Sequence, residues 1–288
     1  MAGERLSNVD YQTPGVRRPV AVINPSRAGR ARPHRHSLAC SSEARGPWLR
    51  RACCAIVNLP GGTLATGASA IFVLLTGLVA SQVAVGAELV VLRGIQSASS
   101  EALDAFAALY THGSSLEPML LVALAGGVAL FLAGWGWRSL APFGFLLTVP
   151  VELAAKMLVA QPQVGSEFVR RSGNYIFFWL GTTYSYPSSH AARAAFLAIA
   201  LWVVLVGIGP LRDRRWLATT LCVTLALTLG FTRVYLGYHW FSDVLGGWAL
   251  GIASAGATAW LVGRRRRTSA GVLIAPTQPV DDRPTGHG

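Results

Sequence analysis

The chain has 288 residues, of which 52% are apolar and only 13% are charged, and its net charge is +12. Ordinary soluble domains carry about 25% charged residues, so this composition excludes a typical soluble protein. The positive excess lies in the flanks, since residues 1–62 hold ten arginines and residues 264–288 hold five. Basic flanks without interleaved aromatic residues argue against a nucleic-acid partner and favour contact with anionic membrane lipids.

The two flanks are predicted to be disordered basic tails, at residues 1–58 and 264–288, around a membrane domain at 59–263. The first apolar run begins only near residue 63, so we expect no cleavable signal peptide. The chain has four cysteines, and none of them shows the spacing of a metal or redox motif. We therefore expect no metal and no cofactor.

Six apolar segments have the length of about 20 residues that a helix needs to cross a bilayer. They lie at residues 63–84, 117–134, 139–159, 190–209, 216–233 and 241–262. The predicted fold is therefore all-α, a bundle of six transmembrane helices. Most arginines near these segments fall on one side if both termini are cytoplasmic, as positively charged loops prefer. Arg170 and Arg171, in the loop at 160–189, are outnumbered exceptions.

Residues 86–112 are too polar to span a membrane. Leu103, Phe106 and Tyr110 recur at helical spacing, whereas Asp104 lies on another face. This pattern is typical of an amphipathic helix lying in the outer interface. An ordinary connecting loop with one helical turn is the alternative.

The predicted orientation brings polar residues from four helices to the extracytoplasmic ends of the spans. These residues are Lys156, His190, Arg233, His239 and Asp243. Polar and ionisable groups next to membrane spans are expensive to keep and mark functional sites. Taken singly, each has a simpler role, such as an interfacial anchor, a snorkelling arginine or a helix cap. Their joint placement favours a site.

The spacing of these residues suits phosphoryl transfer. His239 and Asp243 are four apart at the start of a helix, so the carboxylate can orient the imidazole and leave its other nitrogen free to attack. Arg233, across a turn at Gly237, can bind phosphate oxygens with its planar fork. His190 is placed to act as a general acid. Ser188 and Ser189 precede it at a helix start, where hydroxyl and backbone N–H groups can hold an anion.

The pattern Arg233-x5-His239-x3-Asp243, preceded by Pro-Ser-Ser-His ending at His190 and by Lys156, resembles the type-2 phosphatidic acid phosphatase family. That family shares its signature with soluble vanadium haloperoxidases and glucose-6-phosphatase, and the resemblance covers about residues 60–262. It implies a metal-independent membrane phosphatase that forms a phosphohistidine. By this resemblance His239 is the nucleophile, Asp243 orients it and His190 is the acid, while Lys156, Ser188, Ser189 and Arg233 bind phosphate.

The sequence departs from the family pattern at several positions. The first motif of the family places an Arg-Pro pair where this chain has Gln163 and Val164, which removes one phosphate-binding cation. A charge-assisted contact of this kind contributes about 1.5–3 kcal/mol. Arg193, one turn beyond His190, is a candidate to replace that charge, as are Arg170 and Arg171 if their loop folds inward. Ser189 stands in place of the usual Gly, where its side chain can crowd the backbone cradle. Thr232 replaces the usual Ser, which is a mild change that keeps the hydroxyl.

Three functions fit these observations. The preferred interpretation is an integral membrane phosphatase acting on a lipid phosphate or diphosphate at the extracytoplasmic face. Phosphatidic acid, phosphatidylglycerophosphate and polyprenyl diphosphate all suit the motifs, which do not choose among them. The second is a phosphotransferase with the same nucleophile and an acceptor other than water. The third is a catalytically weakened protein that binds lipid phosphate or acts as a scaffold.

Overall fold

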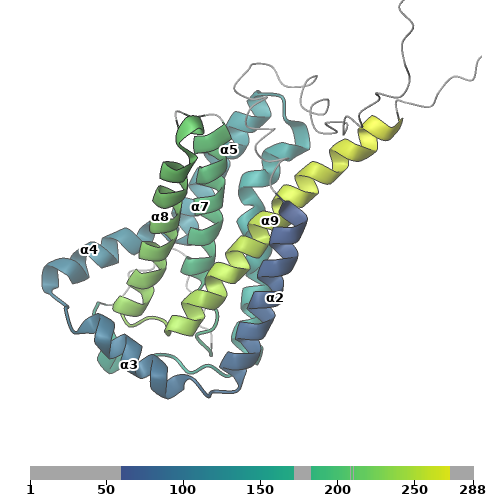
Figure 1. The fold of residues 1–288 in the computed structure, drawn as a ribbon. Helices are drawn as coiled ribbons and strands as arrows, with labels where there is room; N and C mark the ends of the chain where they lie inside the picture. Colours follow the sequence, from purple (N-terminus) through teal and green to yellow (C-terminus); the bar gives the residue numbers. More distant parts are fainter. Residues whose placement is uncertain (1–59, 172–182, 208, 210, 273–288) are drawn as a thin grey trace, which may run out of the picture. The chain divides into compact units, whose positions relative to one another are not determined.

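All regular elements in the described part of the chain are helices. The computed structural model describes residues 60–171, 183–207, 209 and 211–272, and side chains as far as residue 263 (Figure 1). These residues belong to one compact unit. The α-helices are α2 (Gly61–Ala80), α3 (Val85–Gln96), α4 (Glu101–Thr111), α5 (Leu116–Leu132), α6 (Thr148–Leu158), α7 (Ser189–Gly207), α8 (Arg215–Tyr235) and α9 (Phe241–Val272). The predicted all-α fold class is confirmed.

Five helical segments are long and apolar enough to cross a membrane: 61–80, 136–158, 189–207, 212–235 and 241–263. A sixth arises if 101–114 and 116–132, which meet at a bend of 43°, form one broken span. The predicted second span, 117–134, corresponds to α5, which is one half of this broken span. Ser115 has extended backbone angles, φ −66° and ψ 162°, and this residue interrupts the helix before α5. The predicted third span also starts differently, because a 3-10 helix, η4 (Gly136–Leu147), leads into α6.

Helix α9 runs through the middle of the bundle and packs against α2 and α7 (Figure 1). Gly247 permits a close approach to α7, because an added Cβ atom at this position would collide with the carbonyl oxygen of Ser188. The helix continues to Val272, past the domain boundary expected at 263. The expected N-terminal tail, 1–58, lies outside the described residues.

Residues 86–112 form two helices, α3 and α4, and not one. In α4 the polar face lies against the protein: Asp104 is 6% exposed and accepts hydrogen bonds from Arg170 Nε and from the hydroxyl of Tyr235. Phe106 and Leu109 point outward, with 60% and 74% exposed. An apolar outer face fits a helix surrounded by lipid. Because Arg170 pairs with Asp104 on α4, it does not supply the missing phosphate-binding charge.

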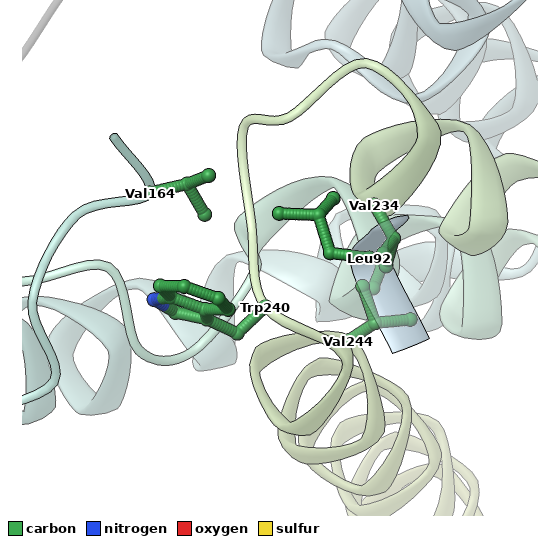
Figure 2. Close-up of a cluster of buried hydrophobic side chains, with 6 residues drawn as sticks. Leu92, Val164, Val234, Trp240 and Val244 are labelled. Atoms are coloured by element: carbon green, nitrogen blue, oxygen red, sulfur yellow. The ribbon is translucent and has the colours of Figure 1, made fainter. Parts of the chain in front are cut away.

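A buried apolar cluster beside the polar end of α9 ties α3 to the bundle. Leu92 of α3 is fully buried among Val164, Val234, Trp240 and Val244, which come from the chain after α6, from α8, from the α8–α9 turn and from α9 (Figure 2). The cluster fixes the start of α9 from several directions at once. It thereby provides a rigid support for the residues that follow.

Candidate active site

The turn between α8 and α9 brings the last residues of one helix next to the first residues of the other. Gly237 has φ +74°, and an added Cβ atom would collide with the carbonyl oxygen of Phe168. A left-handed backbone and a close neighbour together require glycine at this position. The backbone N–H groups of Tyr238 and His239 both donate to the carbonyl oxygen of Arg233, at 3.0 and 3.3 Å. Arg233 and His239 are thus held close together by the backbone.

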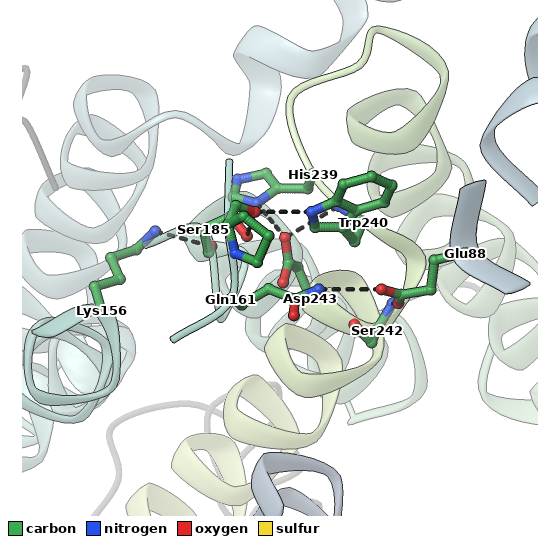
Figure 3. A network of polar contacts seen from close by, with 9 residues as sticks. Glu88, Lys156, Gln161, Ser185, His239, Trp240, Ser242 and Asp243 are labelled. Carbon is green, nitrogen blue, oxygen red and sulfur yellow. Dashed lines mark hydrogen bonds and ion pairs between the residues drawn. The ribbon is translucent and has the colours of Figure 1, made fainter. Parts of the chain in front are cut away.

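The His239 imidazole is oriented by the Asp243 carboxylate. The Nδ1 atom of His239 lies 3.1 Å from Oδ2 of Asp243, and the backbone N–H of Trp240 donates to the same oxygen at 3.0 Å (Figure 3). Asp243 is fully buried and His239 is 8% exposed. A carboxylate that accepts Nδ1–H fixes the tautomer and leaves the lone pair on Nε2.

The surroundings of His239 favour its neutral form. Burial lowers the pKa of His239 well below its ordinary value, and the positive charges of Lys156 and Arg233 lower it further. Each effect disfavours the imidazolium, since a buried cation loses hydration and like charges repel. A neutral imidazole at neutral pH retains a lone pair that can attack an electrophile.

The segment before α7 lies against the start of α9. The backbone N–H of Ser188 donates to the Asp243 carbonyl oxygen at 2.9 Å, and Lys156 Nζ donates to the Ser185 carbonyl oxygen at 3.2 Å. The hydroxyl of Ser188 is fully buried and makes no hydrogen bond within the described part of the chain. A buried hydroxyl with no partner is costly.

Tyr186 anchors this segment to α2. Its ring is fully buried, stacks on Phe72 with centroids 5.8 Å apart, and its hydroxyl lies 3.0 Å from Oγ1 of Thr76. Burial raises the pKa of Tyr186 to about 12, so the phenol stays neutral at physiological pH. The side chain also lies directly over Gly246 of α9. Tyr186 therefore holds the serine segment between two helices.

Arg233 is positioned by an aromatic ring as well as by the turn. The side chain is 5% exposed, and its guanidinium carbon lies 4.3 Å from the centroid of the Tyr238 ring. A guanidinium over an aromatic face is stabilised by the cation–π interaction and keeps its planar fork in a defined plane. This arrangement suits the binding of an oxyanion.

The predicted acid and the predicted substitute cation contact a different segment, at the break between α4 and α5. The Nε2 atom of His190 lies 3.3 Å from Oγ of Ser115, and Nε of Arg193 donates to the Ser114 carbonyl oxygen at 2.7 Å. His190 lies in the first turn of α7, which begins at the half-buried Ser189, and Arg193 lies one turn further along the helix. Gln163 is exposed in the chain after α6.

The structure brings the residues that the sequence predicted for the site to one end of the helix bundle. Lys156 lies near the end of α6, His190 at the start of α7, Arg233 near the end of α8, and Asp243 in the first turn of α9. Within the described ranges, no three His, Cys, Asp or Glu side chains lie close enough together to hold a metal ion. The positive charges at this end are supplied by Lys and Arg side chains.

Sequence reasoning missed two buried polar residues of this region. Glu88 of α3 is 7% exposed and Gln161 is 1% exposed, and the two are hydrogen-bonded to each other. The signal for Glu88 was a single carboxylate within an otherwise apolar stretch of a membrane protein, which is a candidate for function. No comparable signal exists for Gln161.

Comparison with known proteins identifies the family. The model of the PAP2 superfamily matches residues 120–267. The chain is 35% identical over 72 residues to phosphatidylglycerophosphatase B of Bacillus subtilis strain 168, and 37% identical over 70 residues to undecaprenyl-diphosphatase of Sulfolobus acidocaldarius. These matches take in 25% and 24% of this chain and only 36% and 30% of the two relatives, so they span about a third of the curated proteins.

A solved structure has the same fold. It is the transmembrane PAP2-type phosphatidylglycerolphosphate phosphatase of Bacillus subtilis, with a TM-score of 0.56 and 18% sequence identity. The likeness covers 74% of this chain and 98% of that one. At this identity the likeness bears on the fold alone. Together with the apolar helices and the family match, it leads to one conclusion: the chain is an integral membrane protein that belongs to the PAP2 superfamily.

Proposed function

We propose that this protein is a phosphatase that hydrolyses a lipid phosphate or diphosphate through a phosphohistidine on His239. The observation that carries the proposal is the imidazole of His239, held at Nδ1 by Asp243 and flanked by the cations Lys156 and Arg233. The names of two relatives support a lipid substrate, since one is a phosphatidylglycerophosphatase and the other an undecaprenyl-diphosphatase.

The reaction proceeds in two displacements. The Nε2 lone pair of His239 attacks the terminal phosphorus, and the bond from this phosphorus to the leaving oxygen breaks. His190 gives its proton to that oxygen, which is the lipid oxygen of a monophosphate or the bridging oxygen of a diphosphate. His190 then takes a proton from water, whose oxygen attacks the phosphohistidine and releases inorganic phosphate. Asp243 stabilises the positive charge that the imidazole acquires in the first step. His190 finishes the cycle protonated again.

Binding of the substrate phosphate falls to the cations and hydroxyls around His239. Lys156 and Arg233 provide charge, and the unpartnered hydroxyl of Ser188 can donate to a phosphate oxygen. Ser189 adds the N-terminus of α7, where backbone N–H groups favour anions. Arg193, one turn beyond His190, is the candidate for the charge that Gln163 does not supply.

The site is proposed to face the extracytoplasmic side. Arg212 and Arg214 lie between α7, which begins at the site, and α8, which returns to it, and Arg215 is the first residue of α8. These arginines are therefore at the opposite end, which the preference of cytoplasmic loops for Lys and Arg assigns to the cytoplasm. The basic tails, 1–58 and 264–288, flank the 59–263 membrane domain on that cytoplasmic side.

Cysteine labelling tests this orientation. After removal of the native cysteines, a cysteine at Ser166 should react with an impermeant thiol reagent in intact cells. A cysteine at Asp213 should react only after the cells are permeabilised. Both positions are exposed, so access to solvent in each compartment decides the result. The reverse pattern would refute the extracytoplasmic site.

Phosphate release by purified protein tests the activity itself. The panel contains phosphatidic acid, phosphatidylglycerophosphate, a polyprenyl diphosphate and p-nitrophenyl phosphate, each in excess EDTA. We expect release that vanadate inhibits and that His239→Ala abolishes for every substrate. Loss of release in EDTA with recovery in Mg²⁺ would refute a metal-independent mechanism. Transfer of the phosphoryl group to an added alcohol in place of water would identify the phosphotransferase.

One competing function is that of a catalytically weakened protein that binds lipid phosphates. It is favoured by Gln163, which stands where the first motif of the family has an arginine. Gln163 is exposed and uncharged at that place. Such a protein would bind lipid phosphates with no release of phosphate, and His239→Ala would leave that binding unchanged.

A further inference from the structure

Glu88 makes two hydrogen bonds that reach across the molecule to the start of α9. One carboxylate oxygen accepts the backbone N–H of Ser242 at 2.8 Å, and the other accepts Nε2 of Gln161 at 3.0 Å (Figure 3). The carboxylate is 7% exposed. It lies on α3, a helix that contributes nothing else to the site described above.

The bond to Ser242 caps the helix that carries Asp243. The first four N–H groups of a helix have no acceptor within it, and an anion next to them is stabilised by the helix dipole. Here the acceptor for the second residue of α9 comes from a residue 154 positions earlier in the chain. Asp243 is the next residue, so the position of this turn decides where its carboxylate meets the imidazole of His239.

The bond to Gln161 holds the other wall of the site. The Gln161 carbonyl oxygen accepts the backbone N–H of Ser185 at 3.1 Å. The next carbonyl, that of Pro162, accepts Nε1 of Trp240 at 2.8 Å and the Ser185 hydroxyl at 3.1 Å. Ser185 in turn accepts the hydrogen bond from Lys156. One buried carboxylate therefore connects the first turn of α9 with the segment that carries the phosphate-binding serines.

We propose that Glu88 and Gln161 form a positioning pair that sets the geometry between Asp243 and His239. The proposal rests on the proposed function, since it concerns the alignment of the same nucleophile. The hydrogen bonds of Glu88 go to Ser242 and Gln161, so the pair acts through other residues of the site. A displacement of reacting groups by about 1 Å costs up to a hundredfold in rate, so loss of the pair should appear in turnover.

The chemistry of the pair allows its bonds to be exchanged. Gln161→Glu places two carboxylates against each other, which repel when both are ionised and, at alkaline assay pH, have no shared proton between them. Glu88→Gln added to that variant restores the pattern: the amide oxygen accepts from Ser242, and the amide nitrogen donates to the new carboxylate at position 161. Glu88→Ala removes both bonds. Glu101→Gln, at an exposed position in the first turn of α4, removes an equal charge as a control.

The test compares kcat and KM for p-nitrophenyl phosphate and for a lipid phosphate. Glu88→Ala and Gln161→Glu should lower kcat about tenfold to a hundredfold, equally on both substrates, with little change in KM. The double variant, Glu88→Gln with Gln161→Glu, should return close to wild type, and Glu101→Gln should have no effect. If Glu88→Ala does not fold, Gln161→Glu and the double variant still decide. Unchanged kcat in Gln161→Glu, or no recovery in the double variant, would overturn the proposal.

Amide hydrogen exchange separates this proposal from the proposed function. The rate of exchange in the first turn of α9 and in residues 183–188 should rise in Gln161→Glu and fall back to the wild-type rate in the double variant. This result is expected whether or not the protein is active. Inactive wild-type protein with this exchange pattern would refute the phosphatase and leave the pair established as a structural brace. Active wild-type protein without the pattern would overturn the positioning pair alone.

Discussion

Asp243→Asn should be a mild variant, and the reason lies in the second hydrogen bond to the carboxylate. In a Ser-His-Asp triad the same substitution costs about 10⁴ in kcat, because the amide nitrogen forces the wrong tautomer on the histidine. Here Oδ2 accepts both His239 Nδ1–H and the backbone N–H of Trp240. An amide nitrogen at the position of Oδ2 would point its own N–H groups at two other N–H donors. The amide oxygen should therefore take the place of Oδ2 and keep the tautomer.

The remaining loss is that of the negative charge. Hydrogen bonds to charged acceptors contribute about 1.5–3 kcal/mol and those to neutral acceptors about 0.5–1.5 kcal/mol. The difference, about 1–1.5 kcal/mol, corresponds to a roughly tenfold lower kcat. Asp243→Ala, which removes both bonds, should be far worse. The assay is the kcat for p-nitrophenyl phosphate together with the burst of a single turnover. A loss near 10⁴-fold in Asp243→Asn would show that the backbone N–H of Trp240 does not fix the amide.

Other substitutions test the remaining roles. His190→Ala should reduce hydrolysis of lipid phosphates about 10²–10⁴-fold. It should affect hydrolysis of p-nitrophenyl phosphate much less, because that leaving group needs no proton. Equal losses on both substrates would show that His190 is not the acid. Lys156→Met should raise the pKa of His239, because it removes a neighbouring positive charge. The fall of kcat/KM at low pH, where protonation removes the nucleophile, should therefore move to higher pH. A fall that stays at the same pH or moves to lower pH would contradict this. Arg193→Ala should weaken substrate binding and be partly rescued by Gln163→Arg, as measured by KM; strict additivity would exclude compensation.

Hydropathy predicted most of the fold, because span-length apolar segments can be recognised one at a time. It placed the spans of α2, α7, α8 and α9 within a few residues. It also separated the segment at 86–112 from the span at 117–134, between which the helix breaks at Ser115. It did not predict the 3-10 helix that contains Pro142, because this is a largely apolar stretch whose backbone is set by its neighbours. The α4 helix was predicted, but its polar face turned out to be buried through Asp104 and Arg170.

The motif residues could be assigned to one end of the bundle from spacing and from the charges of loops. Their immediate contacts could not. The single carboxylate of Glu88 could be singled out in the sequence, but its contacts could not, because Ser242 and Gln161 lie far away along the chain. Tyr186 was visible within a motif, but its stacking on Phe72 of α2 required the fold.

The length of α9 sets the depth at which the protein can meet a phosphate group. From Asp243 to Arg264 the helix rises about 31 Å at 1.5 Å per residue, close to the ~30 Å thickness of a bilayer's hydrocarbon core. The arginines at 264–267 follow in the same continuous helix. When they sit among the head groups of one leaflet, Asp243 reaches the head groups of the other. Insertion of three or four residues before Arg264 would lengthen the distance between these arginines and the proposed nucleophile, His239, by about 5 Å. It should leave the contacts around His239 unchanged and thus test the depth of the proposed site alone.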